Sequence, residues 1–225
     1  MKKKEKQIGI IDYGVGNIFN IEKACRLYSE NVILARTAED MKNCHAIILP
    51  GVGAFAYGME CLRKRGLVKP IQDFARSGRT VLGICLGAQL LFSKSFEMGE
   101  TEGLNLISGQ VVAFPPLKLG YKVPNIGWRA LKFKKSAKSS WSNLDGKFMY
   151  FVHSYVIIPD AKDCIVATAS YGGCKFCAIC SKGNIYGNQF HPEKSGKNGL
   201  VFIKDFIHNI KTDEPNRKIR SAGHS

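Results

Sequence analysis

Residues 80–92 read Thr-Val-Leu-Gly-Ile-Cys-Leu-Gly-Ala-Gln-Leu-Leu-Phe, a strand that turns into a helix at Cys85. Gly83 and Gly87 stand two residues before and after this cysteine, the spacing of a nucleophile elbow, where small neighbours allow a sharp turn. The backbone N–H groups that open the helix would face the sulfur and favour its thiolate form. We therefore predict that Cys85 is a nucleophile; the alternative is a buried cysteine that only packs in a β–α turn.

Apolar strands alternate with helices on the N-terminal side of this elbow. The sequence predicts strands over residues 8–12, 32–34, 46–49 and 81–84, and helices over residues 18–29 and 67–77. Strands without polar alternation are typical of a parallel sheet that is covered on both faces. The chain is therefore predicted to be an α/β protein with a mainly parallel central sheet flanked by helices.

The third predicted strand runs into Pro50-Gly51-Val52-Gly53, and in a parallel sheet this loop emerges at the same carboxyl edge as Cys85. Its glycines allow backbone N–H groups to face inward, as an oxyanion hole requires; the alternative is an ordinary β–α connection. A second glycine pair, Gly14 and Gly16, lacks the third glycine of a dinucleotide fingerprint because that position is Phe19. We therefore predict no nucleotide cofactor.

The pattern changes after the elbow. Residues 104–114 and 146–187 carry short alternating strands with turn residues between them, which favours an antiparallel addition to the sheet. Residues 132–143 are predicted to form an exposed loop, and residues 198–210 a closing amphipathic helix. We expect a single domain over residues 1–211, followed by a polar tail over residues 212–225.

The net charge of +15 is dispersed along the 225 residues rather than gathered in a nucleic-acid-binding module. Residues 1–6 contribute +3, residues 132–138 contribute +4 and residues 213–220 contribute +1. Solvated faces and a partner of complementary charge are therefore favoured over RNA or DNA. The eight cysteines accompany no export signal and no apolar run of membrane-spanning length. We expect a cytoplasmic protein with reduced thiols that does not enter a membrane.

Cys174, Cys177 and Cys180 form a C-x-x-C-x-x-C run, with Cys164 upstream, which raises the alternative of a metal or iron–sulfur site. The intervening apolar residues predict a strand, in which cysteines three apart would fall on opposite faces. We therefore expect free cysteines in the core and no metal.

Residues 187–195 read Gly-Asn-Gln-Phe-His-Pro-Glu-Lys-Ser. In an extended segment His191 and Glu193 lie on the same side, and Pro192 stiffens the link between them. A His-Pro-Glu sequence alone could be no more than a turn. Together with Cys85 it predicts a nucleophile, a base and an orienting carboxylate.

These residues resemble the class I, triad-type glutamine amidotransferases, and closely the glutaminase subunits of imidazole glycerol phosphate synthase in histidine biosynthesis. Matching segments cover nearly the whole chain: residues 12–17, 49–55, 83–92, 124–128, 150–155 and 189–195. The resemblance implies the single-domain, flavodoxin-like fold of this class, with an antiparallel extension of the sheet.

The resemblance also implies a role for each matching residue. Cys85 would attack the side-chain amide carbon of L-glutamine, His191 would transfer protons and Glu193 would hold the imidazole. Backbone N–H groups of Leu86 and of the Val52 and Gly53 region would bind the oxyanion. The residues matching the substrate-binding positions are Gly51, Gln89, Glu97, His153, Ser154 and Tyr155.

In the family, ammonia passes to a (β/α)8-barrel cyclase subunit that makes imidazole glycerol phosphate and AICAR, and the two subunits form a heterodimer. Trp128 and Lys194 match positions facing that barrel, and the resemblance implies low glutaminase activity until the partner's acceptor site is filled.

Two positions of that interface depart from the family's Pro-His-Met-Gly-Trp-Asn form, because Asn125 replaces a histidine and Arg129 replaces an asparagine. This keeps open a paralogous subunit that supplies ammonia for the amidation or amidination of surface sugars. A free-standing cysteine or γ-glutamyl hydrolase on a similar fold is a further alternative.

Overall fold

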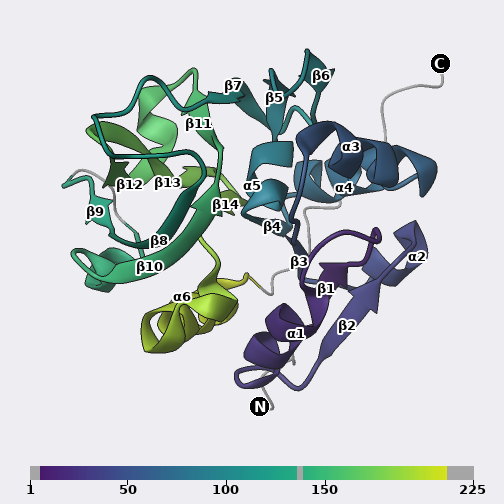
Figure 1. Ribbon diagram of the computed structural model, residues 1–225. Helices are drawn as coiled ribbons and strands as arrows, with labels where there is room; N and C mark the ends of the chain where they lie inside the picture. Colours follow the sequence, from purple (N-terminus) through teal and green to yellow (C-terminus); the bar gives the residue numbers. More distant parts are fainter. Residues whose placement is uncertain (1–5, 136–138, 212–225) are drawn as a thin grey trace, which may run out of the picture.

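The computed structural model describes residues 6–135 and 139–211, so the predicted tail over residues 212–225 lies outside the described residues. The central sheet has the strand order β2-β1-β3-β4-β14-β13-β12-β9 (Figure 1). Its parallel part consists of β2 (Val32–Ala35), β1 (Ile8–Ile11), β3 (Ala46–Leu49), β4 (Thr80–Ile84) and β14 (Ile185–Asn188). The predicted parallel sheet is confirmed.

Antiparallel strands extend this sheet, also as predicted. They are β13 (Cys174–Lys182), β12 (Ile165–Tyr171) and β9 (Lys132–Phe133). A second sheet consists of β11 (Tyr155–Pro159), β7 (Ile107–Ala113), β5 (Phe92–Ser95) and β6 (Thr101–Glu102). The strands β8 (Asn125–Ala130) and β10 (Phe148–His153) form a separate antiparallel pair. Short 3-10 helices lie at η1 (Ser142–Leu144), η2 (Lys162–Cys164) and η3 (Pro192–Lys194).

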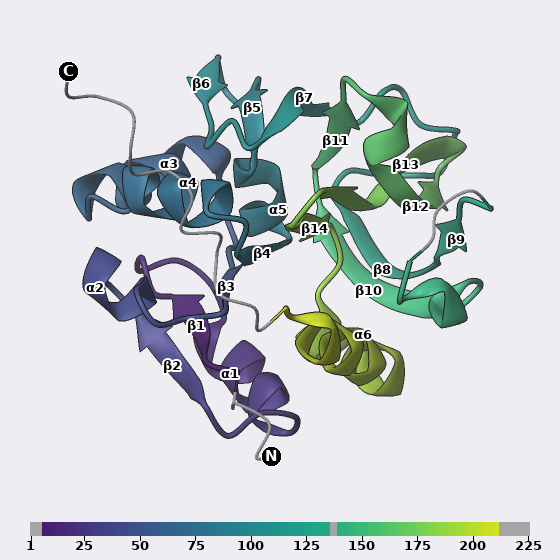
Figure 2. The same ribbon diagram turned by 180° about the vertical axis from the view of Figure 1, so that it is seen from behind.

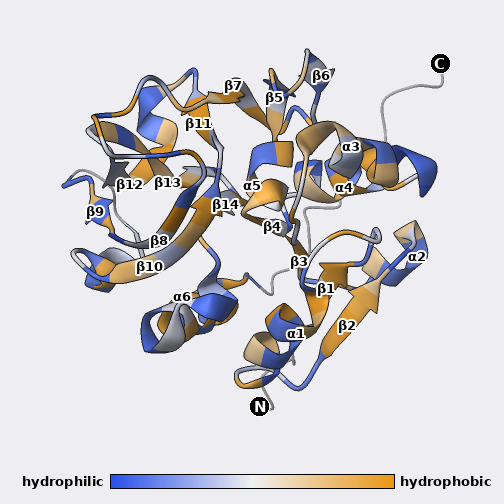
Figure 3. Cartoon of the chain, in the orientation of Figure 1, coloured by the Kyte–Doolittle hydropathy of each residue, from blue (hydrophilic) through white to orange (hydrophobic). Residues whose placement is uncertain are grey.

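Helices cover both faces of the parallel strands, as Figures 1 and 2 show from opposite sides. One face is covered by α1 (Ile18–Arg26) and α6 (Gly196–Asn209). The other is covered by α2 (Ala38–Met41), α3 (Phe55–Lys64), α4 (Val68–Arg76) and α5 (Leu86–Leu90). In β3, Ile48 faces the first cluster while Ile47 and Leu49 face the second, because successive side chains of a strand alternate. Figure 3 shows β1 and β2 in the orange of hydrophobic residues along their length. The helices α3 and α6 carry both hydrophobic (orange) and hydrophilic (blue) residues.

The prediction of an exposed loop over residues 132–143 was wrong at both of its ends. Residues 132 and 133 form strand β9, which pairs with β12. At the other end, Trp141 is buried, its indole N–H donates to the Phe202 carbonyl at 3.0 Å, and the two rings stack at 4.4 Å. A large aromatic side chain whose N–H is hydrogen-bonded anchors this segment to α6, although the neighbouring residues are polar.

The cysteine run lies in β13 as predicted, but the expectation that its members fall on opposite faces was wrong for Cys177 and Cys180. Cys177 pairs with Thr168 and Ile179 with Ala167, so one residue of β13 is extra and forms a bulge. The bulge turns both thiols into the same apolar cluster, where the hydrogen bond with Cys180 and burial raise the pKa of Cys177. Among the described residues, no group of His, Cys, Asp or Glu is arranged to hold a metal ion.

Candidate active site

The carboxyl ends of adjacent parallel strands bring the predicted site together. Strands β3, β4 and β14 are neighbours in the sheet. They lead into the Pro50–Gly53 loop, into Cys85 and into the segment that ends at His191, respectively. Parallel neighbours end at one edge, so residues more than a hundred positions apart meet there.

Cys85 sits on a strained turn between β4 and α5, with φ 54° and ψ −111°. Positive φ is costly for a residue with a side chain and marks a position that the surroundings enforce. Both flanking glycines are required: a Cβ at Gly83 would lie 2.5 Å from the Gly87 carbonyl oxygen, and one at Gly87 would lie 1.8 Å from the Leu49 carbonyl oxygen. The predicted elbow is therefore present in the structure, although α5 ends at Leu90 and is too short for a large helix dipole.

His191 and Glu193 form a buried pair behind Cys85. Nδ1 of His191 donates to Oε1 of Glu193 at 2.9 Å, and both side chains are at most 3% exposed. The contact does not arise from strand alternation as predicted, because Pro192 begins the 3-10 helix η3 and His191 is its N-cap. The tight turn, rather than an extended segment, brings the carboxylate back to the imidazole.

The surroundings of His191 favour the protonated imidazole. Burial lowers the pKa of His191. The neighbouring Cys85 sulfur and the hydrogen bond to Glu193 raise it by more than burial lowers it, so that the pKa is about 10. Nε2 of His191 is buried and has no hydrogen-bond partner within the described part of the chain. With Nδ1 engaged by Glu193, Nε2 is the nitrogen left to exchange a proton with the site.

The backbone of His191 is fixed by two residues to which the sequence analysis gave no role. The His191 N–H donates to the Tyr150 carbonyl at 2.9 Å, and the Ser195 hydroxyl donates to the His191 carbonyl at 2.7 Å. The same Ser195 oxygen accepts the Tyr150 N–H at 2.9 Å. The only sequence signal for this support was a serine four residues after the histidine, and its burial is seen only in the structure.

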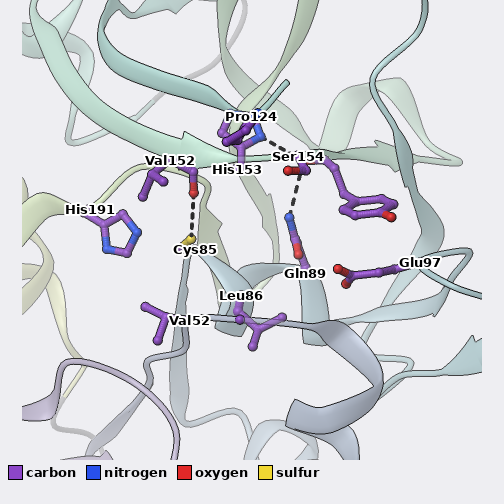
Figure 4. Close-up of a pocket in the computed structure, with 12 residues that line it drawn as sticks. Val52, Cys85, Leu86, Gln89, Glu97, Pro124, Val152, His153, Ser154 and His191 are labelled. Atoms are coloured by element: carbon purple, nitrogen blue, oxygen red, sulfur yellow. Dashed lines mark hydrogen bonds between the residues drawn. The ribbon is translucent and has the colours of Figure 1, made fainter. Parts of the chain in front are cut away.

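A pocket of about 330 Å³ opens over Cys85. Figure 4 shows His191 on one side of the sulfur and Gln89 and Glu97 on the other. The residues lining the pocket are Val52, Gly53, Cys85, Leu86, Gln89, Glu97, Pro124, Val152, His153, Ser154, Tyr155 and His191. The predicted catalytic, oxyanion and substrate-binding residues therefore meet in one cavity, except for Gly51 and Glu193, which do not line it. Pro124 and Val152 line it and were not predicted.

A chain of amides links the nucleophile to the far wall of the pocket. Gln89 Nε2 donates to Gln189 Oε1 at 3.0 Å and to the Tyr155 carbonyl at 3.4 Å, and Gln189 Nε2 approaches the Cys85 sulfur at 3.8 Å. The thiol itself lies 3.9 Å from the Val152 carbonyl oxygen. Gln189 is fully buried and was missed as a site residue, although it stands two positions before His191.

Glu97 faces the pocket, and its carboxylate also caps the first residue of α3. Its Oε2 accepts the Phe55 N–H at 2.7 Å, at the helix end where N–H groups lack intrahelical partners. No other side chain caps α3, since its N-cap residue is Ala54. One carboxylate therefore joins a wall of the pocket to the end of the Pro50–Gly53 loop.

The predicted oxyanion residues differ in how firmly they are held. Leu86 is buried at the start of α5, whereas Val52 is 41% exposed and Gly53 is exposed at φ 94°. Gly51, predicted to contact substrate, is buried at the start of the loop, where a Cβ would lie 2.9 Å from the Leu86 Cβ. The absence of a side chain lets the loop approach α5, and the contact with substrate stays a prediction.

Asn125, predicted to lie at a partner interface, is fully buried and does not reach the surface. Its Nδ2 donates to Nε2 of His153 at 3.0 Å, while His153 Nδ1 donates to the Tyr155 carbonyl at 2.8 Å. This assigns His153 the neutral tautomer with the proton on Nδ1. Burial lowers the pKa of His153 to about 4.

The other predicted interface residues lie on β8 and in η3, but they do not share one face. Trp128 is 48% exposed and packs edge-on against Tyr150, and Lys194 is exposed in η3. Arg129 is only half-exposed, because its guanidinium donates to the Trp128 and Ile126 carbonyls and lies 4.6 Å above the Tyr171 ring. The further exposed apolar side chains on the same face of the pair as Trp128 are Ile126 and Phe148.

In the described ranges, no helix is long and apolar enough to cross a membrane.

Comparisons with known proteins show the family of the chain. The sequence matches the family described as glutamine amidotransferase class-I over residues 9–210. Imidazole glycerol phosphate synthase subunit HisH of Caldanaerobacter subterraneus subsp. tengcongensis is 44% identical over 204 residues, covering 91% of this chain and 98% of that protein. The protein of the same name from Lactococcus lactis subsp. lactis is 41% identical over 206 residues, covering 91% of this chain and 100% of that protein.

Solved structures show the same fold at low identity. A structure described as a glutamine amidotransferase superposes with a TM-score of 0.69 at 16% identity, covering 89% of this chain and 98% of that one. PurLQS from Thermotoga maritima superposes with a TM-score of 0.67 at 18% identity, covering 92% and 100%. The chain therefore belongs to the class-I glutamine amidotransferase family, in the group that contains the HisH subunits of imidazole glycerol phosphate synthase.

Proposed function

We propose that this chain is a cytoplasmic glutaminase subunit that hydrolyses L-glutamine through Cys85, His191 and Glu193 and delivers the ammonia to a (β/α)8-barrel cyclase. The observation that carries the proposal is the buried His191–Glu193 hydrogen bond of 2.9 Å beside a cysteine on a strained elbow. A nucleophile and a base that line one pocket, with a carboxylate that orients the base, are the requirements of acyl transfer through a covalent intermediate.

The reaction follows from the protons that these groups can move. His191 Nε2 takes the thiol proton of Cys85, and the thiolate attacks the side-chain amide carbon of glutamine. The imidazolium then protonates the departing nitrogen, which leaves as ammonia and yields a glutamyl thioester. His191 next takes a proton from water, the hydroxide attacks the thioester, and glutamate leaves as the proton returns to the sulfur. Glu193 keeps the imidazole oriented and stabilises its charged form.

The pocket offers polar groups where glutamine would need them. The Glu97 carboxylate, on the side of Cys85 away from His191, suits the α-ammonium group of an amino acid (Figure 4). Ser154 and Tyr155 line the same wall. The N–H groups of Leu86, Val52 and Gly53 are the donors available for the tetrahedral oxyanion.

The docking side is the outer surface of the β8–β10 pair, which carries the exposed Trp128 and the neighbouring exposed apolar side chains. Exposed aromatic and apolar groups gathered on one surface are typical of protein interfaces. Asn125 and Arg129, whose identities favoured a sugar-modifying partner, both turn inward onto their own chain. Their departure from the family pattern is therefore weak support for a different partner.

The test is glutamate release by the purified chain, alone and with a (β/α)8-barrel cyclase and its nucleotide. We expect low turnover alone, a large rise with the loaded partner, and loss of at least about 10⁴-fold for Cys85→Ala, since removing a nucleophile removes the whole covalent route. Full turnover without a partner would favour the free-standing hydrolase. Partner-stimulated turnover that survives Cys85→Ala would exclude the mechanism.

A further inference from the structure

The first residues of the Pro50–Gly53 loop are held by a side chain from the segment that follows β1. Tyr13 follows β1 and is 1% exposed, and its hydroxyl donates to the Pro50 carbonyl at 2.7 Å. A Cβ placed on Gly51 would lie 2.6 Å from the same hydroxyl. One buried hydroxyl therefore contacts both residues with which the loop begins.

The opposite side of Gly51 rests on the start of α5. A Cβ there would lie 2.9 Å from the Leu86 Cβ and 3.0 Å from the Gly87 nitrogen. The Pro50–Gly51 peptide is thus held between Tyr13 and the helix that follows the nucleophile. Proline has no N–H to donate, so the carbonyl is the one backbone group through which Pro50 can form a hydrogen bond.

The clamp ends after Gly51. The Val52 side chain is 41% exposed, and a Cβ on Gly53 would meet nothing within 4 Å. The chain is held again at Phe55, whose N–H donates to Glu97 at 2.7 Å. The peptides free to turn are therefore those between Gly51 and Ala54, and they include the proposed oxyanion donors.

We propose that Tyr13 is a positioning residue for the oxyanion hole: its hydrogen bond to the Pro50 carbonyl fixes the start of the loop, so that only the Val52 and Gly53 N–H groups turn toward the substrate. This rests on the proposed glutaminase function and deepens it. Burial raises the pKa of Tyr13, so the hydroxyl stays protonated and remains a donor. The side chain acts through the loop and touches no reacting atom.

Tyr13→Phe tests this role because it keeps the ring and removes only the hydroxyl. The full-length chain, alone and with its cyclase partner, is assayed for kcat and KM with L-glutamine. In parallel, the rate of Cys85 alkylation by iodoacetamide is measured, because that displacement forms no oxyanion. We expect kcat to fall about tenfold or more, less than the loss of a whole oxyanion donor, with KM changed by less than about twofold. The alkylation rate stays at the wild-type value.

The matched control is Tyr28→Phe, at a tyrosine near the end of α1 that packs on the core away from the site; it leaves all three quantities unchanged. A wild-type kcat in Tyr13→Phe overturns the proposal while leaving the glutaminase function intact. A fall in alkylation that parallels the fall in kcat also overturns it, because Tyr13 would then only support the fold. Failure of the function itself is seen separately, as activity that survives Cys85→Ala.

Discussion

The nucleophile elbow and the Pro50–Gly53 loop lie at the ends of adjacent strands, but one is rigidly enclosed and the other is open in its middle. At the elbow, a single methyl group added at Gly87 would fall 1.8 Å from a backbone oxygen. In the loop, a methyl group added at Gly53 would meet nothing within 4 Å. The difference suits an enzyme whose nucleophile and base are preformed while its oxyanion donors still have to be arranged.

The largest effect is expected when a side chain is added to a glycine of the enclosed elbow. Gly87→Ala forces a methyl group against the Leu49 carbonyl and should lower the free energy of unfolding by more than about 3 kcal/mol, since a backbone atom cannot move aside cheaply. Gly53→Ala is the matched control, and should cost only about 1–2 kcal/mol because its φ of 94° is strained for alanine. Denaturant unfolding of both variants measures the contrast, and equal losses would contradict it.

Glu193→Gln should weaken the preformed pair without opening the fold. The neutral amide no longer stabilises a charged imidazole, so the pKa of His191 should fall from its raised value of about 10. We expect kcat with glutamine to drop about 10²–10³-fold with little change in KM. Steady-state kinetics across pH would show both changes. A kcat within threefold of wild type would mean that the carboxylate does not assist the base.

The buried His153, in the pocket wall, should make the stability of the fold sensitive to acid. Its pKa is lowered to about 4 in the folded protein, so below about pH 6.5 the unfolded chain binds a proton that the folded chain refuses. Stability is therefore lost as pH falls from about 6.5 toward 4, by about 2 kcal/mol at pH 5 relative to pH 7. Unfolding at both pH values should show a smaller loss in His153→Gln. The same loss in that variant would assign the acid sensitivity to other groups.

Trp128→Ala should lower the glutaminase activity only by weakening the binding of the partner. If the proposed docking surface is correct, truncating this exposed aromatic side chain is expected to weaken binding of the cyclase by about 1–2 kcal/mol. The partner-stimulated glutaminase rate at limiting partner should fall accordingly, while alkylation of Cys85 by iodoacetamide stays constant. Titrating the cyclase into both proteins measures the shift. Lys182→Ala, whose side chain reaches the Leu106 carbonyl, is a control away from the β8–β10 surface.

Local sequence was enough to locate most of the site. The glycines around Cys85 and the His-Pro-Glu segment predicted the nucleophile and its base, and the apolar strands predicted the edge at which they meet. The route by which Glu193 reaches His191 was not predictable, because a proline can stiffen an extended segment or begin a 3-10 helix, and only packing selects between them. Gln189 and Ser195 were missed for a related reason: their roles depend on hydrogen bonds to residues far away in the chain.

Apolar periodicity and backbone sterics within a few residues were enough to predict the class of the fold, Cys85 as the nucleophile and the need for glycine on both sides of it. The directions in which the remaining side chains face emerged only from the folded arrangement. Asn125 and Arg129 turn inward, a bulge brings Cys177 and Cys180 together, and Tyr13 reaches the carbonyl at the start of the Pro50–Gly53 loop. Burial and hydrogen bonding between distant segments fix these directions, and no local pattern records them.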